Sequence, residues 1–222
     1  MSYKIKKVAV LGSGVMGSGI ACHLANVGID VLMLDIVPKN LEKGKSRNMV
    51  ADESLSRVVK SKPNPIYNKE FLKRIKTGNF DDDFEKISSA DWIIEVVVEN
   101  LEIKKQIFEK VEKYKSKDSF VSSNTSSIPI NLLCEGRSKD FKKNFCGTHF
   151  FNPARYMRLL EIIPQTETDS KLVEFLMDFG DITLGKQTVL CKDTPAFIAN
   201  RIGIMAGIKL LQLTDKYDFT IE

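Results

Sequence analysis

Short apolar runs alternate with longer amphipathic segments along almost the whole chain. The runs are rich in Val, Ile, Leu and Phe, which is typical of strands buried on both faces of a parallel sheet. This pattern predicts strands at residues 8–11, 31–34, 75–78, 91–98, 120–123, 144–149, 158–164 and 183–190. Helices are predicted between them, for example over residues 18–28 and 169–179. Such alternation predicts an α/β fold with a doubly wound, mostly parallel sheet.

Two segments do not fit a simple alternation of short strands and single helices. Residues 38–74 are rich in lysine and mostly helical in pattern, with a break at Pro63-Asn64-Pro65. This connection is longer than a crossover needs, so we expect a helical insertion that projects from the sheet. A second helix is predicted over 193–213, with Pro195 in its first turn, and it is apolar nearly all round. We therefore divide the chain into a domain at 1–192 and, at 193–222, the beginning of a truncated helical C-terminal domain.

A glycine-rich turn lies between the first predicted strand and the first predicted helix. It reads Gly12-Ser13-Gly14-Val15-Met16-Gly17. In this context a GxGxxG pattern predicts a dinucleotide-binding turn of the Rossmann type. Gly12 permits the tight turn, Gly14 lets the backbone approach the pyrophosphate, and Gly17 lets the helix pack closely on the strand. The positive end of the helix then faces the phosphates.

An acidic residue closes the second predicted strand. Asp35 follows Gly17 by 18 residues, and its carboxylate is placed to accept hydrogen bonds from the ribose hydroxyls of a bound dinucleotide. It would repel a 2′-phosphate, and Ile36 rather than an arginine follows it. These residues favour NAD over NADP, while Lys39 is near enough to keep NADP open.

Composition adds only mild constraints. Hydrophobic residues make up 43% and charged residues 28% of the 222 residues, as in ordinary globular proteins. The net charge of +4 suits an anionic small ligand, and we expect no nucleic-acid partner. Four widely spaced cysteines indicate reduced thiols in a cytoplasmic protein and no metal site. No apolar run reaches the roughly 18 residues of a membrane span, so we expect no signal peptide and no membrane partner.

Histidine is scarce, which draws attention to both copies. His23 lies within the first predicted helix, where a packing or surface role is expected. His149 stands in Gly147-Thr148-His149-Phe150-Phe151-Asn152-Pro153, just after a predicted strand. Ligands of doubly wound sheets bind beyond the carboxyl ends of the strands. The residues that we expect to meet at this rim are Gly12–Gly17, Asp35, Glu99, Ser126 and His149.

Several segments together resemble the L-3-hydroxyacyl-CoA dehydrogenases, including the 3-hydroxybutyryl-CoA dehydrogenases. The resemblance covers nearly the whole chain. It is carried by the glycine turn with Gly19-Ile20-Ala21, by Val98-Glu99-Asn100-Leu101, Ser123-Asn124-Thr125-Ser126-Ser127 and His149-Phe150-Phe151-Asn152-Pro153, and by Asp193-Thr194-Pro195 with Asn200-Arg201. It implies NAD-dependent oxidation of the 3-hydroxyl of an acyl-CoA to a ketone, as in the β-oxidation of fatty acids.

The resemblance also implies roles for individual residues. His149 would be the catalytic base and Glu161 its partner, while Ser126 and Asn200 would hydrogen-bond the reacting end of the substrate. The cofactor would contact Gly12, Gly14, Val15, Met16, Gly17, Asp35, Glu99, Lys104, Ser126 and Asn152. Coenzyme A would contact Ser54 and Lys60. Glu161 lies in an apolar strand, where a buried acid is costly without a partner, and this agrees with its implied role.

The chain departs from the family pattern at three places. Pro195-Ala196-Phe197 stands where the family usually has Pro-Gly-Phe, so the added methyl group should shift the helix start slightly. Arg155 and Tyr156 stand where small apolar residues are usual, which bears on the acyl pocket. The family normally continues into a helical domain that closes over the acyl-CoA and forms the dimer.

Because this chain stops where that domain has barely begun, we expect NAD binding with little or no turnover from these 222 residues. We also expect association into a homodimer through the C-terminal helical region. Two alternatives remain open. One is a related NAD-dependent dehydrogenase of the gulonate type, and the other is a non-catalytic NAD-binding module.

Overall fold

The computed structural model describes residues 4–220 and contains one eight-stranded sheet. The strands are β1 (Lys7–Leu11), β2 (Asp30–Asp35), β3 (Ile75–Asn79), β4 (Trp92–Glu95), β5 (Phe120–Ser123), β6 (Phe145–Phe150), β7 (Leu159–Pro164) and β8 (Gln187–Leu190). The α-helices are α1 (Val15–Asn26), α2 (Met49–Val58), α3 (Leu101–Tyr114), α4 (Ile130–Leu133), α5 (Lys139–Lys143), α6 (Ser170–Asp178) and α7 (Ala199–Lys216). Two 3-10 helices, η1 (Lys69–Arg74) and η2 (Phe84–Ser89), and one π-helix, η3 (Phe179–Thr183), complete the described elements.

The strands follow the spatial order β3-β2-β1-β4-β5-β6-β7-β8. All neighbouring strands run parallel except β6 and β7, which are antiparallel. The first six positions have the strand order of a Rossmann fold, with the switch in chain direction between β1 and β4. The predicted α/β, doubly wound, mostly parallel sheet is therefore confirmed.

Both faces of the sheet are covered, as the unbroken apolar strands require. Alternate residues of β1 point to opposite faces: Val8 and Val10 pack in one core, Ala9 and Leu11 in the other. The first core joins the sheet to α1, α2 and α6, and the second joins it to η2, α3, α4 and α5. This arrangement leaves the ends of the strands as the accessible edges of the sheet.

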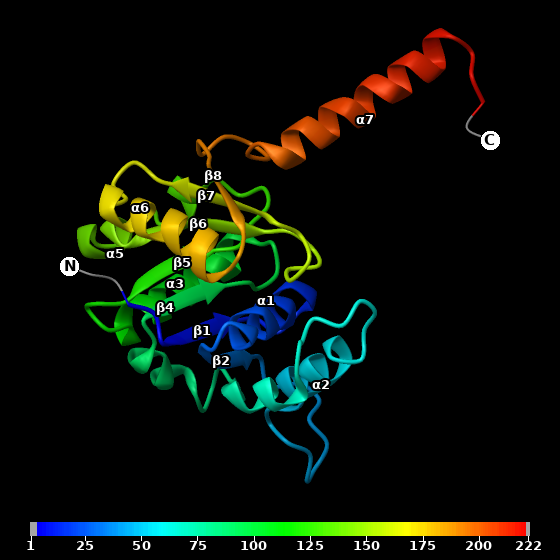
Figure 1. Ribbon diagram of the computed structural model, residues 1–222. Coiled ribbons are helices and arrows are strands. Elements are labelled where there is room, and N and C mark those ends of the chain that lie inside the picture. The colour runs from blue at the N-terminus through cyan, green and yellow to red at the C-terminus, as the bar shows by residue number, and fades with distance from the viewer. Residues whose placement is uncertain (1–3, 221–222) are drawn as a thin grey trace.

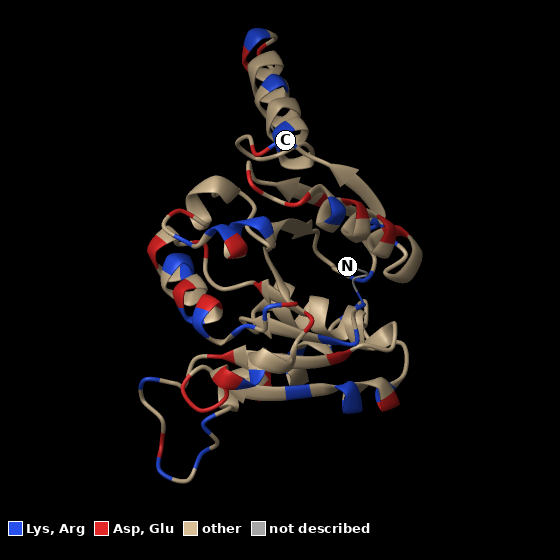
Figure 2. Ribbon diagram, turned by 90° about the vertical axis from the view of Figure 1, so that its left-hand side faces the viewer, with Lys and Arg blue, Asp and Glu red and all other residues tan. Residues whose placement is uncertain are grey.

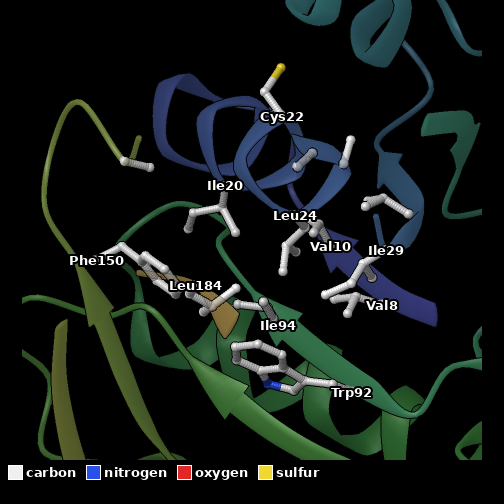
Figure 3. Packing of buried hydrophobic residues seen from close by; sticks show 14 of the residues in the cluster. Val8, Val10, Ile20, Cys22, Leu24, Ile29, Trp92, Ile94, Phe150 and Leu184 are labelled. Carbon is white, nitrogen blue, oxygen red and sulfur yellow. The ribbon is translucent and has the colours of Figure 1, made fainter. Parts of the chain in front are cut away.

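The first core shows how α1 is seated on the sheet. Figure 3 shows Ile20 and Leu24 reaching from the helix toward the strand residues around Val10 and Trp92. All four side chains are fully buried. Burying such side chains contributes about 1.5–3 kcal/mol each, so α1 and its leading glycine turn are held firmly in place. The predicted glycine at the end of this helix, Gly28, has a positive φ of 90°, as a C-terminal cap requires.

Several predicted boundaries are wrong. The segment 38–74 is helical only at α2 and η1, and residues 36–48 form a loop. Helix α2 packs beside α1 instead of projecting, because Ala51 is buried and Leu55 packs in the same core. Strand β4 ends at Glu95 rather than Val98, because the Glu95 carboxylate accepts a hydrogen bond from the backbone of Val97 and turns the chain. Strand β8 is confined to Gln187–Leu190, since Thr183 belongs to η3.

The last helix stands apart from the rest of the molecule. Figure 1 shows α7 extending away from the sheet, and Figure 2 shows that most of its length is uncharged. Its large apolar side chains are exposed, among them Ile202 at 63%, Met205 at 64% and Leu211 at 63%. None of the helices in the described residues is both long and apolar enough to cross a membrane.

Helix α7 begins at Ala199, later than predicted, because a turn precedes it. Ala196 and Phe197 have positive φ angles of 63° and 49°, so the chain is not helical at Pro195. The left-handed conformation costs a residue with a Cβ atom about 1 kcal/mol relative to glycine. We therefore expect Ala196→Gly to raise the free energy of unfolding by several tenths to about 1 kcal/mol. Urea denaturation of the two proteins checks this, and an Ala196→Gly protein less stable than the wild type would contradict the strained turn.

The second histidine is a buried packing residue. His23 is 5% exposed, its Nε2 lies 3.0 Å from the carbonyl oxygen of Leu184, and its Nδ1 has no hydrogen-bond partner among the described residues. Burial, with a contribution from the charge of Lys186, lowers the pKa of His23 from 6.5 to about 4. The native state therefore holds this imidazole neutral at pH values where the unfolded chain would protonate it.

This burial predicts a loss of stability in mild acid. Between pH of roughly 6.5 and 4 the unfolded state binds more protons at His23, so stability falls as the pH falls. At about 1.4 kcal/mol for each unit of pKa shift, the contribution lost is about 3 kcal/mol. His23→Gln keeps a donor for Leu184 but does not titrate, so its unfolding free energy should fall less between pH 7 and pH 4.5. Parallel slopes in denaturant titrations of the two proteins would contradict this.

Candidate active site

The glycine turn has the geometry that a dinucleotide requires. Gly12 has a φ of 107°, and a Cβ atom there would lie 2.5 Å from the carbonyl oxygen of Val96. A Cβ atom on Gly17 would lie 1.9 Å from the carbonyl oxygen of Gly12, so strand and helix approach too closely for any side chain. Around Gly14 no atom lies within 4 Å of a Cβ position. The first and last glycines thus shape the turn, and the middle one keeps space open over the N-terminus of α1.

Asp35 reaches the glycine turn from the end of β2. Its Oδ2 accepts hydrogen bonds of 2.6 Å from both the backbone N–H and the hydroxyl of the buried Ser13. Its Oδ1 accepts a hydrogen bond of 2.7 Å from the backbone N–H of Ile36. A carboxylate offers about four acceptor positions, so one remains for a ribose hydroxyl. Asp35 therefore braces the turn as well as facing the site predicted for the cofactor.

Exposed apolar side chains line the same edge of the sheet. Val15 after β1 is 69% exposed, Ile36 after β2 is 54% exposed and Val98 after β4 is 63% exposed. Each follows the carboxyl end of a strand at or beside the β1–β4 switch. Such residues offer flat apolar surface to the rings of a dinucleotide, next to a turn that leaves space for its phosphates. The residues present therefore fit NAD.

The two candidate catalytic residues lie opposite each other on neighbouring strands. In the antiparallel pair β6 and β7, His149 is in register with Glu161, so both side chains project from the same face. The Nδ1 of His149 lies 2.8 Å from Oε2 of Glu161, with the two side chains 5% and 0% exposed. A carboxylate can only accept, so Nδ1 carries the proton and Nε2 is left as an acceptor.

The remaining oxygen of Glu161 binds the turn before α7. Oε1 accepts hydrogen bonds from the backbone N–H groups of Ile198 at 3.1 Å and Ala199 at 2.8 Å. The buried Phe197 ring lies 5.7 Å from the His149 ring, and Phe151 lies 4.4 Å from it on another side. The left-handed turn at 196–197 thus delivers two donors to Glu161 and excludes water from the histidine–glutamate pair.

Ser126 lies at the free nitrogen of His149. Its hydroxyl is 3.2 Å from Nε2, close enough for a hydrogen bond, and a substrate oxygen beside the two atoms could contact both. Glu99 holds the loop that carries Ser126, because its Oε1 accepts hydrogen bonds from Ser126, Ser127 and Thr125. Burial alone would raise the pKa of Glu99, but these donors and Lys104 together lower it.

Lys104 lies beneath this loop and is buried, with 1% exposure. Its Nζ lies 2.6 Å from Oε1 of Glu95, 3.3 Å from Oε2 of Glu99 and 3.3 Å from the carbonyl oxygen of Val97. The contacts with Glu95 and Val97 are hydrogen bonds, and the contact with Glu99 is an ion pair. Burial raises the pKa of Glu95, and the charge of Lys104 acts against this rise. In this structure Lys104 supports Glu99 rather than pointing into open space.

A cavity of about 330 Å³ lies between the glycine turn, α2 and the loop after β6. Ser54, predicted to contact coenzyme A, and Asn152, predicted to contact the cofactor, both line it, but Lys60 is exposed and does not. Arg57 and Lys62 line it instead. Both cations were missed because the lysine-rich segment offers many candidates at similar spacing. Arg57 lies on α2 and Lys62 in the loop that follows it, and the fold brings both to the cavity.

Two further predicted site residues are Met16 and Asn200. Met16 packs against the first hydrophobic core, behind the turn. Asn200 is the second residue of α7 and directly follows the two amides that bind Glu161, and the described residues give its side chain no hydrogen bond. Sequence inspection missed Ser13, Glu95 and Asn124, whose Oδ1 accepts from the backbone N–H of Phe150 at the end of β6. An acid inside the apolar strand β4 was the available signal for Glu95.

Known proteins share this arrangement. Residues 7–194 match the family model for the NAD binding domain of 3-hydroxyacyl-CoA dehydrogenase. A probable 3-hydroxyacyl-CoA dehydrogenase of Bacillus subtilis is 53% identical in an alignment of 214 positions that covers 91% of this chain and 27% of that protein. Another from Deinococcus radiodurans is 45% identical over 217 residues, 98% of this chain and 62% of its own length.

A solved structure has the same fold. The crystal structure of 3-hydroxybutyryl-CoA dehydrogenase from Escherichia coli superimposes with a TM-score of 0.72 at 30% identity, over 90% of this chain and 41% of that one. The chain spans less than two thirds of each of the two relatives named above. The family model, however, covers most of it, from the first strand to the turn before the last helix. The chain therefore belongs to the 3-hydroxyacyl-CoA dehydrogenase family and carries its NAD binding domain.

Proposed function

We propose that the protein containing this chain oxidises the 3-hydroxyl of an L-3-hydroxyacyl-CoA to a ketone with NAD as the acceptor. The observation that carries this proposal is the buried pair of His149 and Glu161, with Ser126 at the free imidazole nitrogen. The pair stands at the same edge of the sheet as the glycine turn. When bound, NAD supplies the chemistry of hydride acceptance.

Each protein group has a definite task in this reaction. Nε2 of His149 accepts the proton of the substrate hydroxyl as carbon 3 becomes a ketone. Glu161 keeps the opposite nitrogen protonated and stabilises the imidazolium that forms, which is the logic of the serine protease triad. The hydroxyl of Ser126 donates a hydrogen bond to the substrate oxygen as its charge develops. Glu99 keeps Ser126 in position through the backbone of its loop.

The cavity beside α2 suits the coenzyme A portion of such a substrate. Arg57 and Lys62 supply positive charge for phosphates, and Ser54 supplies a hydroxyl donor. The same charges do not suit a free sugar acid specifically, since such a substrate carries one carboxylate and no long chain. The acyl-CoA reading is therefore preferred over the gulonate-type alternative.

The direct test is acetoacetyl-CoA-dependent oxidation of NADH by the full-length protein. We expect saturable activity with the CoA ester and none with a free 3-hydroxy sugar acid. Activity with the sugar acid alone would refute the CoA substrate. NAD binding without activity toward either class would instead favour a non-catalytic module.

We also propose that the protein is a cytoplasmic homodimer in which α7 takes part in the association. The support is the exposed apolar surface of α7, on which side chains such as Ile202, Met205 and Leu211 lie open to water. The same exposure of α7 supports the proposed division of the chain into an NAD-binding domain at 1–192 and a helical segment from 193. Light scattering of a clean monomer with this helix exposed would count against the association.

A further inference from the structure

Two loops from distant parts of the chain both line the cavity beside α2. The first follows α2 and contributes Ser61, Lys62, Pro63 and Pro65. The second connects β6 to β7 and contributes Asn152, Pro153 and Ala154. The relative position of these loops therefore sets the width of the cavity and the place of Lys62 in it.

Arg155 and Tyr156 join the two loops. Nη1 of Arg155 donates a hydrogen bond of 2.6 Å to the carbonyl oxygen of Asn64, and the hydroxyl of Tyr156 donates one of 2.9 Å to the same oxygen. The Arg155 guanidinium also lies 3.7 Å from the centre of the Tyr67 ring. Neither side chain lines the cavity. The two bulky side chains therefore stay out of the cavity and bind the loop that follows α2.

The β6–β7 loop is itself anchored from the opposite side. Lys186 is 5% exposed, and its Nζ donates to the carbonyl oxygens of Ala154 and, at 2.8 Å, of Met157. Ala154 is buried and packs close to Gly19 of α1. The hydrogen bond of Arg155 therefore ties the loop after α2 to a loop that is itself anchored to α1 and Lys186.

The loop that follows α2 is otherwise attached mainly at its far end. Ile66 is buried in the first core, and the backbone N–H of Tyr67 donates a hydrogen bond of 2.9 Å to Oδ1 of Asn26. Asn26 of α1 donates a hydrogen bond of 2.8 Å to the carbonyl oxygen of Pro65, at the far end of the loop. Asn64 bonds the carbonyl oxygen of Val59, within its own segment. Arg155 and Tyr156 are therefore the contacts that hold the middle of this loop against the rest of the molecule.

We infer that Arg155 and Tyr156 are positioning residues for the coenzyme A portion of the substrate, holding Lys62 and its loop at the width that a phosphate-bearing pantetheine chain fills. This inference rests on the proposed function. It assigns the two residues to binding and not to the chemical step, because neither lines the cavity nor contacts the His149–Glu161 pair.

The test compares Arg155→Ala, Arg155→Lys and Tyr156→Phe with the wild type as full-length proteins. Arg158→Ala is the matched control, since it removes the same charge from the same loop at an exposed side chain that has no hydrogen bond among the described residues. The measurements are calorimetric titration with coenzyme A itself, and KM and kcat with acetoacetyl-CoA. Melting temperature and NAD affinity report whether each variant folds.

We expect Arg155→Ala to raise the dissociation constant of coenzyme A and the KM about tenfold, with kcat changed less than twofold. Tyr156→Phe should raise both by about threefold, since one hydrogen bond is lost and the ring remains. Arg155→Lys should lie between the wild type and Arg155→Ala, because an ammonium group bonds the carbonyl but does not stack as a plane. Arg158→Ala should stay within twofold of the wild type.

Two results would overturn the inference while the proposed function stands. One is coenzyme A affinity within twofold of the wild type in both Arg155→Ala and Tyr156→Phe. The other is a fall in kcat as large as the fall in kcat/KM. If the wild type neither binds coenzyme A nor turns over acetoacetyl-CoA, the proposed function fails and the inference with it.

Discussion

Replacing His149 by Gln in the full-length protein should lower kcat about 10³-fold, within the range of 10²–10⁴ that general-base catalysis contributes. The amide cannot take up the proton that leaves the substrate hydroxyl, although it keeps a similar size. Because His149 is 4% exposed and packs between Phe151 and Phe197, a side chain of similar volume should preserve the fold. Initial rates of acetoacetyl-CoA reduction measure the effect.

Glu161→Gln is the companion change, and it should cost a similar factor. The glutamine offers one acceptor where three N–H donors now converge, from His149, Ile198 and Ala199. One of them must lose its partner, and a lost buried hydrogen bond of this kind is costly. The double variant should be little worse than either single variant, since the two side chains act as a unit. The control is NAD affinity, which should be unchanged in all three variants. Turnover near the wild-type rate in the His149→Gln protein would exclude His149 as the base.

The second large effect is expected at the glycine turn. Gly17→Ala should destabilise the protein by about 3 kcal/mol or more, because its Cβ atom would lie 1.9 Å from the backbone oxygen of Gly12. A backbone oxygen cannot rotate away as a flexible side chain does, so α1 must shift on the sheet. That shift would also move the N-terminus of α1, and NAD binding should be lost. Urea denaturation and NAD titration measure the two effects.

Gly14→Ala is the matched control, because no atom lies within 4 Å of its Cβ position. We expect its stability to fall by no more than about 1 kcal/mol, since Gly14 is the N-cap of α1 and this position prefers glycine to alanine. Its affinity for NAD should nevertheless fall tenfold or more, since the methyl group enters the space reserved for the pyrophosphate. The opposite pattern, with a stable Gly17→Ala protein and an unfolded Gly14→Ala protein, would show that the turn is built differently.

Local features of the fold were readable from the chain. The glycine turn, the helix over residues 15–26 and the strands that flank it depend on neighbouring residues, so their spacing predicts them well. The direction of β7 was also within reach, although we did not predict it. Only eight residues, 151–158, connect β6 to β7, which is too short for a parallel crossover. That reasoning would have placed His149 and Glu161 side by side on antiparallel neighbours.

Predictions failed where long-range contacts override local propensity. Residues 38–48 have helical character but form a loop that Arg47 ties to Asp81 and Asp82. The apolar run after Glu95 has strand character but turns, because the Glu95 carboxylate binds the backbone of Val97. Neither partner is visible from the local pattern. The lining of the cavity by Arg57 and Lys62 rather than Lys60 has the same origin, since it depends on how α2 and the loop after it pack.

The alternation of strands and helices, the dinucleotide-binding turn and the family follow from residue types at fixed short spacings, so they can be read from the chain alone. The partners of those residues follow from the folded arrangement. Register between β6 and β7 brings Glu161 to His149, burial confines Lys104 between Glu95 and Glu99, and packing of two distant loops carries Arg155 to Asn64. Such contacts join residues far apart in the chain, so they follow from strand order and packing rather than from any local pattern.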